Sequence, residues 1–296
     1  MKEALFRGVC TAVITPFSAD GVDLARMKRQ LDRQRECGVH AVVLAGTTGE
    51  NATLTAQEYA SMVAGCTAHI GGRMKVIVGV GGNHTAACLE KARYAASVGA
   101  DAVLMTPPYY NKTSPAGLLA HFRHVADRSP VPLLLYNVPS RTAIGIPAAA
   151  YLELSRHPNI NGVKEASGDF GLCARIAAEC GDELRLYCGN DEQTLPMMAL
   201  GADGVVSVAS NVAPAELAQL TASCLAGDFA AARRQHRRLM PLFRLLFAET
   251  NPIPVKAAMA MLGLDSGMLR LPLTDMAPAG QEALRAALGE LGLLEA

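Results

Sequence analysis

A regular alternation of short apolar runs and longer amphipathic stretches constrains the fold of this chain more than any other feature. Eight runs rich in β-branched and other apolar residues are expected to form strands: Val9–Ile14, Ala41–Ala45, Val76–Val80, Ala102–Thr106, Leu133–Tyr136, Gly162–Glu165, Leu186–Cys188 and Val205–Val208. Continuous rather than alternating apolar runs are typical of parallel strands covered on both faces. Stretches of helical length lie between them, the clearest being Leu24–Cys37, Gln57–His69, Ala86–Val98 and Pro115–Asp127.

A weak internal repeat supports this alternation. The segments Gly38–Val43, Gly99–Leu104 and Gly201–Val206 each place a glycine where a helix would stop, followed by a short loop and a strand. Eight such units of about 30 residues each predict a (β/α)₈ TIM barrel. The main alternative is a doubly wound open sheet, which usually has fewer strands and a glycine-rich first turn. The first turn here, Thr15–Phe17, has no glycine.

The apolar strand runs stop near Gly227, and the rest of the chain is expected to be helical. We therefore predict two parts, a (β/α)₈ catalytic barrel at residues 1–227 and a C-terminal helical region at residues 228–296. The basic run Arg233–Arg238 is interpreted as the solvated face of one of these helices. The apolar face of that helix is expected to comprise Phe229, Ala232, Leu239 and Phe243.

Charge and cysteine content limit the cellular setting and the partners. Lys and Arg together number 27, as do Asp and Glu, so no basic excess favours nucleic acid or an anionic membrane surface. Residues 1–10 lack the apolar core of a signal peptide, and no apolar run reaches the roughly 20 residues of a membrane span. The 8 cysteines form no C-x-x-C pair, which indicates buried free thiols and a reducing cytoplasm.

Lys164 is the most informative candidate for chemistry. It lies in an otherwise apolar strand, next to Glu165, and catalytic groups of parallel barrels collect at the carboxyl ends of the strands. Burial disfavours a charged ammonium group, and an uncharged amine is the nucleophile that forms a Schiff base with a carbonyl substrate. The alternative is a lysine that reaches from the strand end to water.

Other polar side chains follow neighbouring strands. Tyr136 ends the preceding strand at the same level and is a plausible proton shuttle, although a tyrosine there can also be a core residue. Thr47 and Thr48 lie between two glycines and offer hydroxyl and backbone N–H groups to a small carboxylate, or form only a turn. Arg141, in a loop above the barrel, can clamp a second carboxylate or form a surface salt bridge.

Three motifs together resemble the dihydrodipicolinate synthase / N-acetylneuraminate lyase family of class I aldolases. They are Gly46-Thr47-Thr48-Gly49-Glu50, Tyr136-Asn137-Val138-Pro139-Ser140-Arg141-Thr142 and Gly162-Val163-Lys164-Glu165-Ala166. The resemblance continues from Gly8 to the C-terminal segment Asn251–Lys256. Within the family, the second threonine and Arg141 are more similar to the branch that condenses pyruvate with L-aspartate 4-semialdehyde than to the lyases of long sugar acids.

The resemblance implies a role for each candidate residue. Lys164 would form the imine with pyruvate, and Tyr136 would transfer protons, linked to Thr47 and to Tyr110. Thr47 and Thr48 would hold the pyruvate carboxylate. Arg141 would receive the carboxylate of L-aspartate 4-semialdehyde. The resemblance further implies that Gly189 and Val206 line the pocket. It also implies a homotetramer in which Tyr110 reaches the neighbouring subunit, and 4-hydroxy-tetrahydrodipicolinate as the product, an intermediate of the diaminopimelate–lysine route.

No cofactor or metal is expected. Gly79–Asn83 lacks the Gly-Lys-Ser/Thr ending of a phosphate-binding P-loop, and no strong phosphate cradle follows the last two predicted strands. The missing phosphate site argues against pyridoxal phosphate, another partner of lysine imines. His121 and His124 are spaced as a ligand pair on a helix, but no further ligand pattern accompanies them.

Three functions remain open at this point: the condensation just described, another pyruvate-dependent aldolase or lyase of the family acting on a sugar acid or hydroxy-oxo acid, and a non-catalytic barrel that binds a keto acid. A buried lysine is destabilising and unnecessary in a purely binding module, which disfavours the third. The resemblance also predicts weak or absent feedback inhibition by L-lysine. Asn83 and Tyr109 match the lysine-binding members, whereas Ala56, Tyr59 and Ala87 replace their polar residues, with Glu90 one helical turn beyond Ala87.

Overall fold

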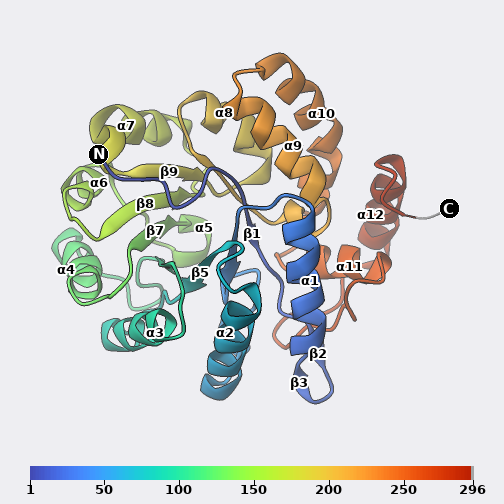
Figure 1. Ribbon diagram of the computed structural model, residues 1–296, viewed down its shortest axis with the longest axis horizontal. Coiled ribbons are helices and arrows are strands. Elements are labelled where there is room, and N and C mark those ends of the chain that lie inside the picture. The colour runs from blue at the N-terminus through green and yellow to red at the C-terminus, as the bar shows by residue number, and fades with distance from the viewer. Residues whose placement is uncertain (295–296) are drawn as a thin grey trace.

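The chain folds as a closed barrel of parallel strands surrounded by helices (Figure 1). The computed structural model describes residues 1–294. Within them, eight strands close the barrel in the order β1-β10-β9-β8-β7-β6-β5-β4. Their bounds are β1 Gly8–Ala12, β4 Ala41–Leu44, β5 Lys75–Gly79, β6 Ala102–Met105, β7 Leu133–Asn137, β8 Ile160–Glu165, β9 Arg185–Cys188 and β10 Gly204–Ser207. The predicted TIM barrel and all eight predicted strands are confirmed, with bounds that differ by one or two residues.

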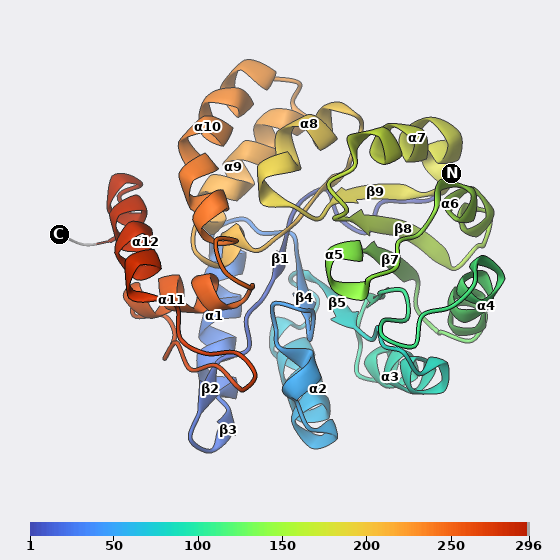
Figure 2. The same cartoon turned by 180° about the vertical axis from the view of Figure 1, so that it is seen from behind.

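Helices connect consecutive barrel strands and form the outer ring (Figure 2). They are α1 Leu24–Glu36, α2 Ala56–Ile70, α3 Thr85–Ser97, α4 Pro115–Ala126, α6 Ala148–Ser155, α7 Phe170–Cys180 and α8 Thr194–Ala199. The helix α9 Pro214–Leu225 follows the last strand, β10, and completes the ring. Local sequence explains where several begin: Asp23 and Ser114 cap α1 and α4, and Thr55 forms a capping box with Glu58 at α2. A small hairpin, β2 Phe17–Ser18 with β3 Gly21–Val22, was not predicted.

Two layers of apolar side chains hold the barrel. The larger lies between the strands and the outer helices, and the smaller fills the barrel interior. Tyr136, Val206 and Cys10 belong to the interior layer. A filled interior is expected of a barrel with eight strands, and it leaves the open carboxyl ends of the strands as the place for a site.

The C-terminal part is helical, as predicted, and its three helices lie together beside α1 and α9 (Figures 1 and 2). They are α10 Phe229–Leu245, α11 Ile253–Met261 and α12 Pro278–Glu290. The assignment of faces on α10 was partly wrong. Phe229 is 39% exposed at the first turn, while His236 from the basic run is buried, with its Nε2 2.8 Å from the Glu192 carbonyl oxygen. The division of the chain at residue 227 stays a prediction.

All 8 cysteines are free thiols, and Cys37 alone among them is only partly buried. This agrees with the predicted free thiols and corrects the expected burial of Cys37. Over the part of the chain that the structure describes, no helix is both long enough and apolar enough to cross a membrane.

Candidate active site

Lys164 and Tyr136 lie side by side at the carboxyl ends of two paired strands. Tyr136 of β7 is the register partner of Lys164 of β8, as their sequence positions predicted. The Lys164 Nζ atom lies 4.2 Å from the centroid of the Tyr136 ring, and both residues are buried. Within residues 1–294, Lys164 has no ion-pair or hydrogen-bond partner. The amine is therefore held only by packing and by the aromatic ring.

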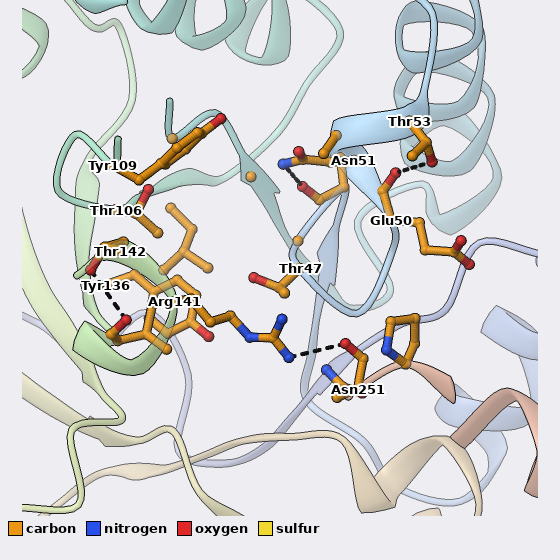
Figure 3. Close-up of a pocket in the computed structure, with 18 of the residues that line it drawn as sticks. Thr47, Glu50, Asn51, Thr53, Thr106, Tyr109, Tyr136, Arg141, Thr142 and Asn251 are labelled. Carbon is orange, nitrogen blue, oxygen red and sulfur yellow. Dashed lines mark hydrogen bonds between the residues drawn. The ribbon is translucent and has the colours of Figure 1, made fainter. Parts of the chain in front are cut away.

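A pocket opens at this end of the barrel (Figure 3). Its walls come from the segments that follow β4, β5, β6 and β7, and from two segments of the C-terminal region. The lining residues that carry polar side chains include Thr47, Glu50, Asn51, Thr106, Tyr109, Tyr136, Arg141 and Asn251. The pocket thus joins the barrel and the C-terminal region around the Tyr136 side chain.

The threonine loop after β4 is shaped by unusual backbone conformations. Ala45 and Glu50 both have φ 52°, in the left-handed region that non-glycine residues rarely adopt. The loop presses so closely on β5 that a Cβ at Gly79 would lie 2.2 Å from the Ala45 carbonyl oxygen. This conformation presents Thr47 to the pocket, whereas the buried Thr48 accepts a hydrogen bond at Oγ1 from Nδ2 of Asn251, at 3.0 Å.

Arg141 lies in a short helix, α5 Pro139–Thr142, where a loop was expected. Its guanidinium lines the pocket, and Nη2 donates to the main-chain carbonyl of Asn251 at 3.0 Å (Figure 3). The structure gives Arg141 no carboxylate partner within residues 1–294, so the expected alternative of a surface salt bridge is not formed.

The remaining predicted site residues lie in three different places. Val206 is fully buried in the barrel interior with Tyr136. Gly189 follows β9, and a Cβ there would lie 2.6 Å from the Ala166 Cβ, so only glycine allows this approach to the segment after Lys164. Tyr110 is 91% exposed with φ 65°, and no hydrogen bond joins it to Tyr136 within residues 1–294.

A buried polar network behind Lys164 was missed by the sequence analysis. The Glu165 carboxylate accepts hydrogen bonds from Nδ2 of Asn137, at 3.0 and 3.1 Å, and from the Tyr151 hydroxyl at 2.8 Å. Burial, followed by the nearby Glu165 charge, raises the pKa of Tyr151 well above its ordinary value, so this phenol remains a donor. Asn137 also accepts from the Ile146 N–H at 3.0 Å, and the network fixes β8 against the segment that carries Arg141.

Asp191 is a second buried carboxyl that sequence reasoning did not single out. One of its oxygens accepts from the N–H groups of Val208 and Ala209, at 3.0 and 2.9 Å. Burial raises the pKa of Asp191, and the positive charge of Lys164 is among the weaker influences that oppose this rise. The side chain therefore ties the segments after β9 and β10 together close to the amine.

The C-terminal region contributes a buried ion pair beneath the threonine loop. Lys256 of α11 donates to Glu50 at 2.6 Å and to the Met268 carbonyl at 2.6 Å, and both charged side chains are almost fully buried. Burial lowers the pKa of Lys256, and the Glu50 carboxylate opposes this shift. The motifs that contain Glu50 and Lys256 were noted in the sequence, but nothing local indicated that the two side chains meet.

The described residues gather no group of three or more His, Cys, Asp or Glu side chains suited to a metal ion. His121, one of the two histidines considered as ligands, is buried against Thr85, with Nδ1 2.8 Å from the Thr85 hydroxyl. Burial lowers the pKa of His121 to about 4. This histidine is therefore a neutral core residue in the structure.

Fold and site together define a (β/α)₈-barrel enzyme with a buried lysine at the mouth of the barrel. The chain belongs to the Dihydrodipicolinate synthetase family, whose sequence pattern matches residues 5–291. A curated relative, 4-hydroxy-tetrahydrodipicolinate synthase of Exiguobacterium sibiricum, is 45% identical over 293 residues, covering 97% of this chain and 100% of the relative.

Solved structures agree with this assignment. A dihydrodipicolinate synthase from Acinetobacter baumannii, described as chloride-inhibited and complexed with pyruvate, matches with a TM-score of 0.96 and 36% identity, over 98% of this chain and 100% of that one. Another, described as the first monomeric dihydrodipicolinate synthase variant, matches with a TM-score of 0.96 and 37% identity, over 98% of each chain.

Proposed function

We propose that this chain condenses pyruvate with L-aspartate 4-semialdehyde to give 4-hydroxy-tetrahydrodipicolinate, a lyase-class reaction of the diaminopimelate–lysine route. The observation that carries the proposal is the Lys164 amine, which is buried beside Tyr136 at the mouth of the barrel with no partner in the described residues. Relatives across the whole length of the chain are named for this activity.

The chemistry begins with attack of the Lys164 amine on the keto carbon of pyruvate. Loss of water leaves an imine, which withdraws electrons so that a proton can leave the methyl carbon. The resulting enamine carbon attacks the aldehyde carbon of the second substrate. The amino group of that substrate then attacks the imine carbon and displaces the Lys164 amine, which closes the ring of the product and frees the lysine. Each step moves a proton, and Tyr136 is the phenol in contact with the amine, so we assign it as the proton donor and acceptor.

We assign the pyruvate carboxylate to the threonine loop. Thr47 lines the pocket, and the hydroxyl of Thr48 lies just beneath it. Short polar side chains on a tight loop suit a small anion because backbone N–H groups and hydroxyls converge there. Gly189 and Val206 are proposed to border the imine, since Gly189 directly follows β9, the strand next to β8, and Val206 lies on β10, the strand beyond it.

Arg141 is proposed to bind the carboxylate of L-aspartate 4-semialdehyde. Its guanidinium lines the pocket above Tyr136 and has no carboxylate partner in the described chain. A planar guanidinium binds a carboxylate through two parallel hydrogen bonds. This residue is the feature that favours an aldehyde substrate with a carboxylate of its own, in addition to that of pyruvate, over the aldehydes used by other pyruvate-dependent lyases.

We further propose a cytoplasmic homotetramer in which Tyr110 completes the site of a neighbouring subunit. The support is the side chain itself, a tyrosine held in the left-handed region and 91% exposed beside the pocket residue Tyr109. A non-glycine residue held in a strained backbone conformation is often functional, and its exposed ring is available for contact with a neighbouring subunit. Sedimentation of the native protein and of Tyr110→Ala tests this, and a monomeric, fully active native protein would contradict it.

Product analysis tests the proposed reaction. The protein is incubated with pyruvate and either L-aspartate 4-semialdehyde or an aldehyde without a carboxylate, and products are identified by mass spectrometry. We expect condensation only with the first aldehyde. The Arg141→Ala variant should lose affinity for that aldehyde by tenfold or more, since a charged hydrogen bond contributes about 1.5–3 kcal/mol, yet still bind pyruvate. Turnover of a sugar-acid substrate instead would favour the alternative lyase function.

A further inference from the structure

Asn251 contacts both groups to which we assign substrate carboxylates. It lies in the segment between α10 and α11, is buried, and lines the pocket. Its side-chain Nδ2 donates to Oγ1 of Thr48, and its main-chain carbonyl accepts from Nη2 of Arg141, both at 3.0 Å. Figure 3 shows Asn251 across the pocket from Tyr136, with its carbonyl oxygen facing the Arg141 guanidinium.

The side-chain contact sets the direction of the Thr48 hydroxyl. A threonine hydroxyl has one proton to donate and two lone pairs to accept with. The Asn251 amide occupies one lone pair, and within residues 1–294 the hydroxyl has no acceptor for its own proton. With Nδ2 facing Thr48, the hydroxyl cannot donate toward Asn251, and its proton is free for an acceptor on another side, such as a carboxylate bound beside the neighbouring Thr47, which lines the pocket.

The same segment is anchored to the threonine loop at a second point. Lys256, on the first turns of α11, pairs with Glu50 at the end of the loop that carries Thr48. Two contacts, one polar and one ionic, thus fix the distance between this segment and the loop. Because the Asn251 carbonyl also holds Arg141, the spacing between Thr48 and Arg141 depends on the C-terminal region.

We propose that Asn251 is a positioning residue. Its side chain orients the Thr48 hydroxyl toward the pyruvate carboxylate, and its main chain holds Arg141 at a fixed distance for the second carboxylate. This inference rests on the proposed function, because it takes Thr48 and Arg141 as the two carboxylate-binding groups. It assigns the C-terminal helical region a part in substrate binding that acts through Thr48 and Arg141.

Two substitutions of Asn251 separate its side-chain contact from its main-chain contact. Asn251→Ala removes the amide but keeps the carbonyl that holds Arg141, so we expect KM for pyruvate to rise about tenfold and KM for the aldehyde to stay within about twofold. Asn251→Asp keeps the shape but accepts the Thr48 proton and adds negative charge, so its KM for pyruvate should rise further. Lowering the pH should partly reverse that effect, since a protonated carboxyl can donate to Thr48 again.

A double-mutant cycle distinguishes positioning from a purely structural role. If Asn251 acts through Thr48, Asn251→Ala should add little to KM for pyruvate in a Thr48→Ala background. The control is Asn159→Ala. Asn159 donates through the same kind of amide to the carbonyls of Ala126, Ser129 and Val131, at 2.8, 2.9 and 3.3 Å, before β8 at the opposite end of the barrel. This variant should lose stability without a change in KM for pyruvate.

Additive effects on KM in the cycle would overturn the inference, as would variants of Asn251 that change only the melting temperature. Failure of the proposed function looks different. If the native protein forms no imine with pyruvate, the carboxylate assignments themselves are wrong. If the native protein forms the imine and both Asn251 variants bind pyruvate normally, only the positioning role is wrong.

Discussion

Two lysines are buried in this molecule, one at the mouth of the barrel and one where the C-terminal helices meet it. Both place Nζ over an aromatic ring, Lys164 at 4.2 Å from Tyr136 and Lys256 at 4.1 Å from Phe17. Lys256 also has a carboxylate and a carbonyl as partners. Lys164 has neither within the described residues.

The difference shows how one type of side chain, a buried lysine, serves a structural purpose in one place and a chemical purpose in another. A buried charge that is paired and hydrogen-bonded fixes one element against another, and removing its partner leaves an uncompensated charge. An amine without such a partner contributes little to holding the fold, and its lone pair can react with a carbonyl carbon. The ring beneath each amine differs too, since Tyr136 carries a hydroxyl that can transfer protons and Phe17 does not.

Among the changes that test this comparison, the largest effect, on catalytic activity, is expected from Tyr136→Phe. This substitution gives Lys164 the same kind of ring that Lys256 has. The aromatic contact remains, but the proton-transferring hydroxyl is lost. We expect kcat to fall by about 10²–10⁴-fold, the usual contribution of a general acid–base group. Steady-state kinetics with a melting curve on the same sample measure this. A fall of less than about fivefold would make Tyr136 a core residue only.

A smaller effect is expected from Lys256→Met, which makes Glu50 a buried carboxylate without its ion-pair partner. Breaking such a pair costs about 3–5 kcal/mol of the free energy of unfolding. Denaturant titration measures the loss, and the paired change Glu50→Gln with Lys256→Met should recover part of it. A loss below about 1 kcal/mol would mean that Lys256 does not differ from Lys164 in the way described.

How much of this comparison the sequence could predict depends on how far apart the residues concerned lie along the chain. The apolar runs fixed the eight strands, and strand order placed Tyr136 beside Lys164, because neighbouring parallel strands end at the same rim. The contacts of Lys256 with Glu50 and of Asn251 with Thr48 join residues more than 200 positions apart. No local periodicity encodes such pairs, so only the resemblance drew attention to these segments.

Smaller errors in the predictions made from the sequence have local causes. On α10, hydrophobicity alone placed Phe229 inside and His236 outside. The observed helix buries His236, whose Nε2 lies close to the Glu192 carbonyl oxygen, while Phe229 at the first position of the helix projects beyond the core. For Thr48, the loop motif suggested a substrate-facing hydroxyl, and the sequence could not show that the Asn251 amide donates to it.

The smallest effect is expected when lysine is added as a free amino acid. The family resemblance predicts polar lysine-binding side chains at the positions where this chain has Ala56, Tyr59 and Ala87. The Tyr59 hydroxyl is already engaged with the Gly79 carbonyl at 3.1 Å. Losing one partner of a desolvated charge weakens binding by tenfold or more. We expect half-inhibition by L-lysine only above about 1 mM. Tighter inhibition would point to the exposed Glu90 as a replacement ligand.

Trapping of the pyruvate adduct tests the central claim most directly, that Lys164 and not Lys256 is the nucleophile. The native protein is treated with pyruvate and sodium borohydride, digested, and mapped by mass spectrometry, with Lys164→Ala treated in parallel. We predict a reduced pyruvate adduct on the peptide containing Lys164 and none in the variant, while Lys256 stays unmodified beneath its ion pair. An adduct on Lys256 or another lysine, or no adduct in the native protein, would contradict the account.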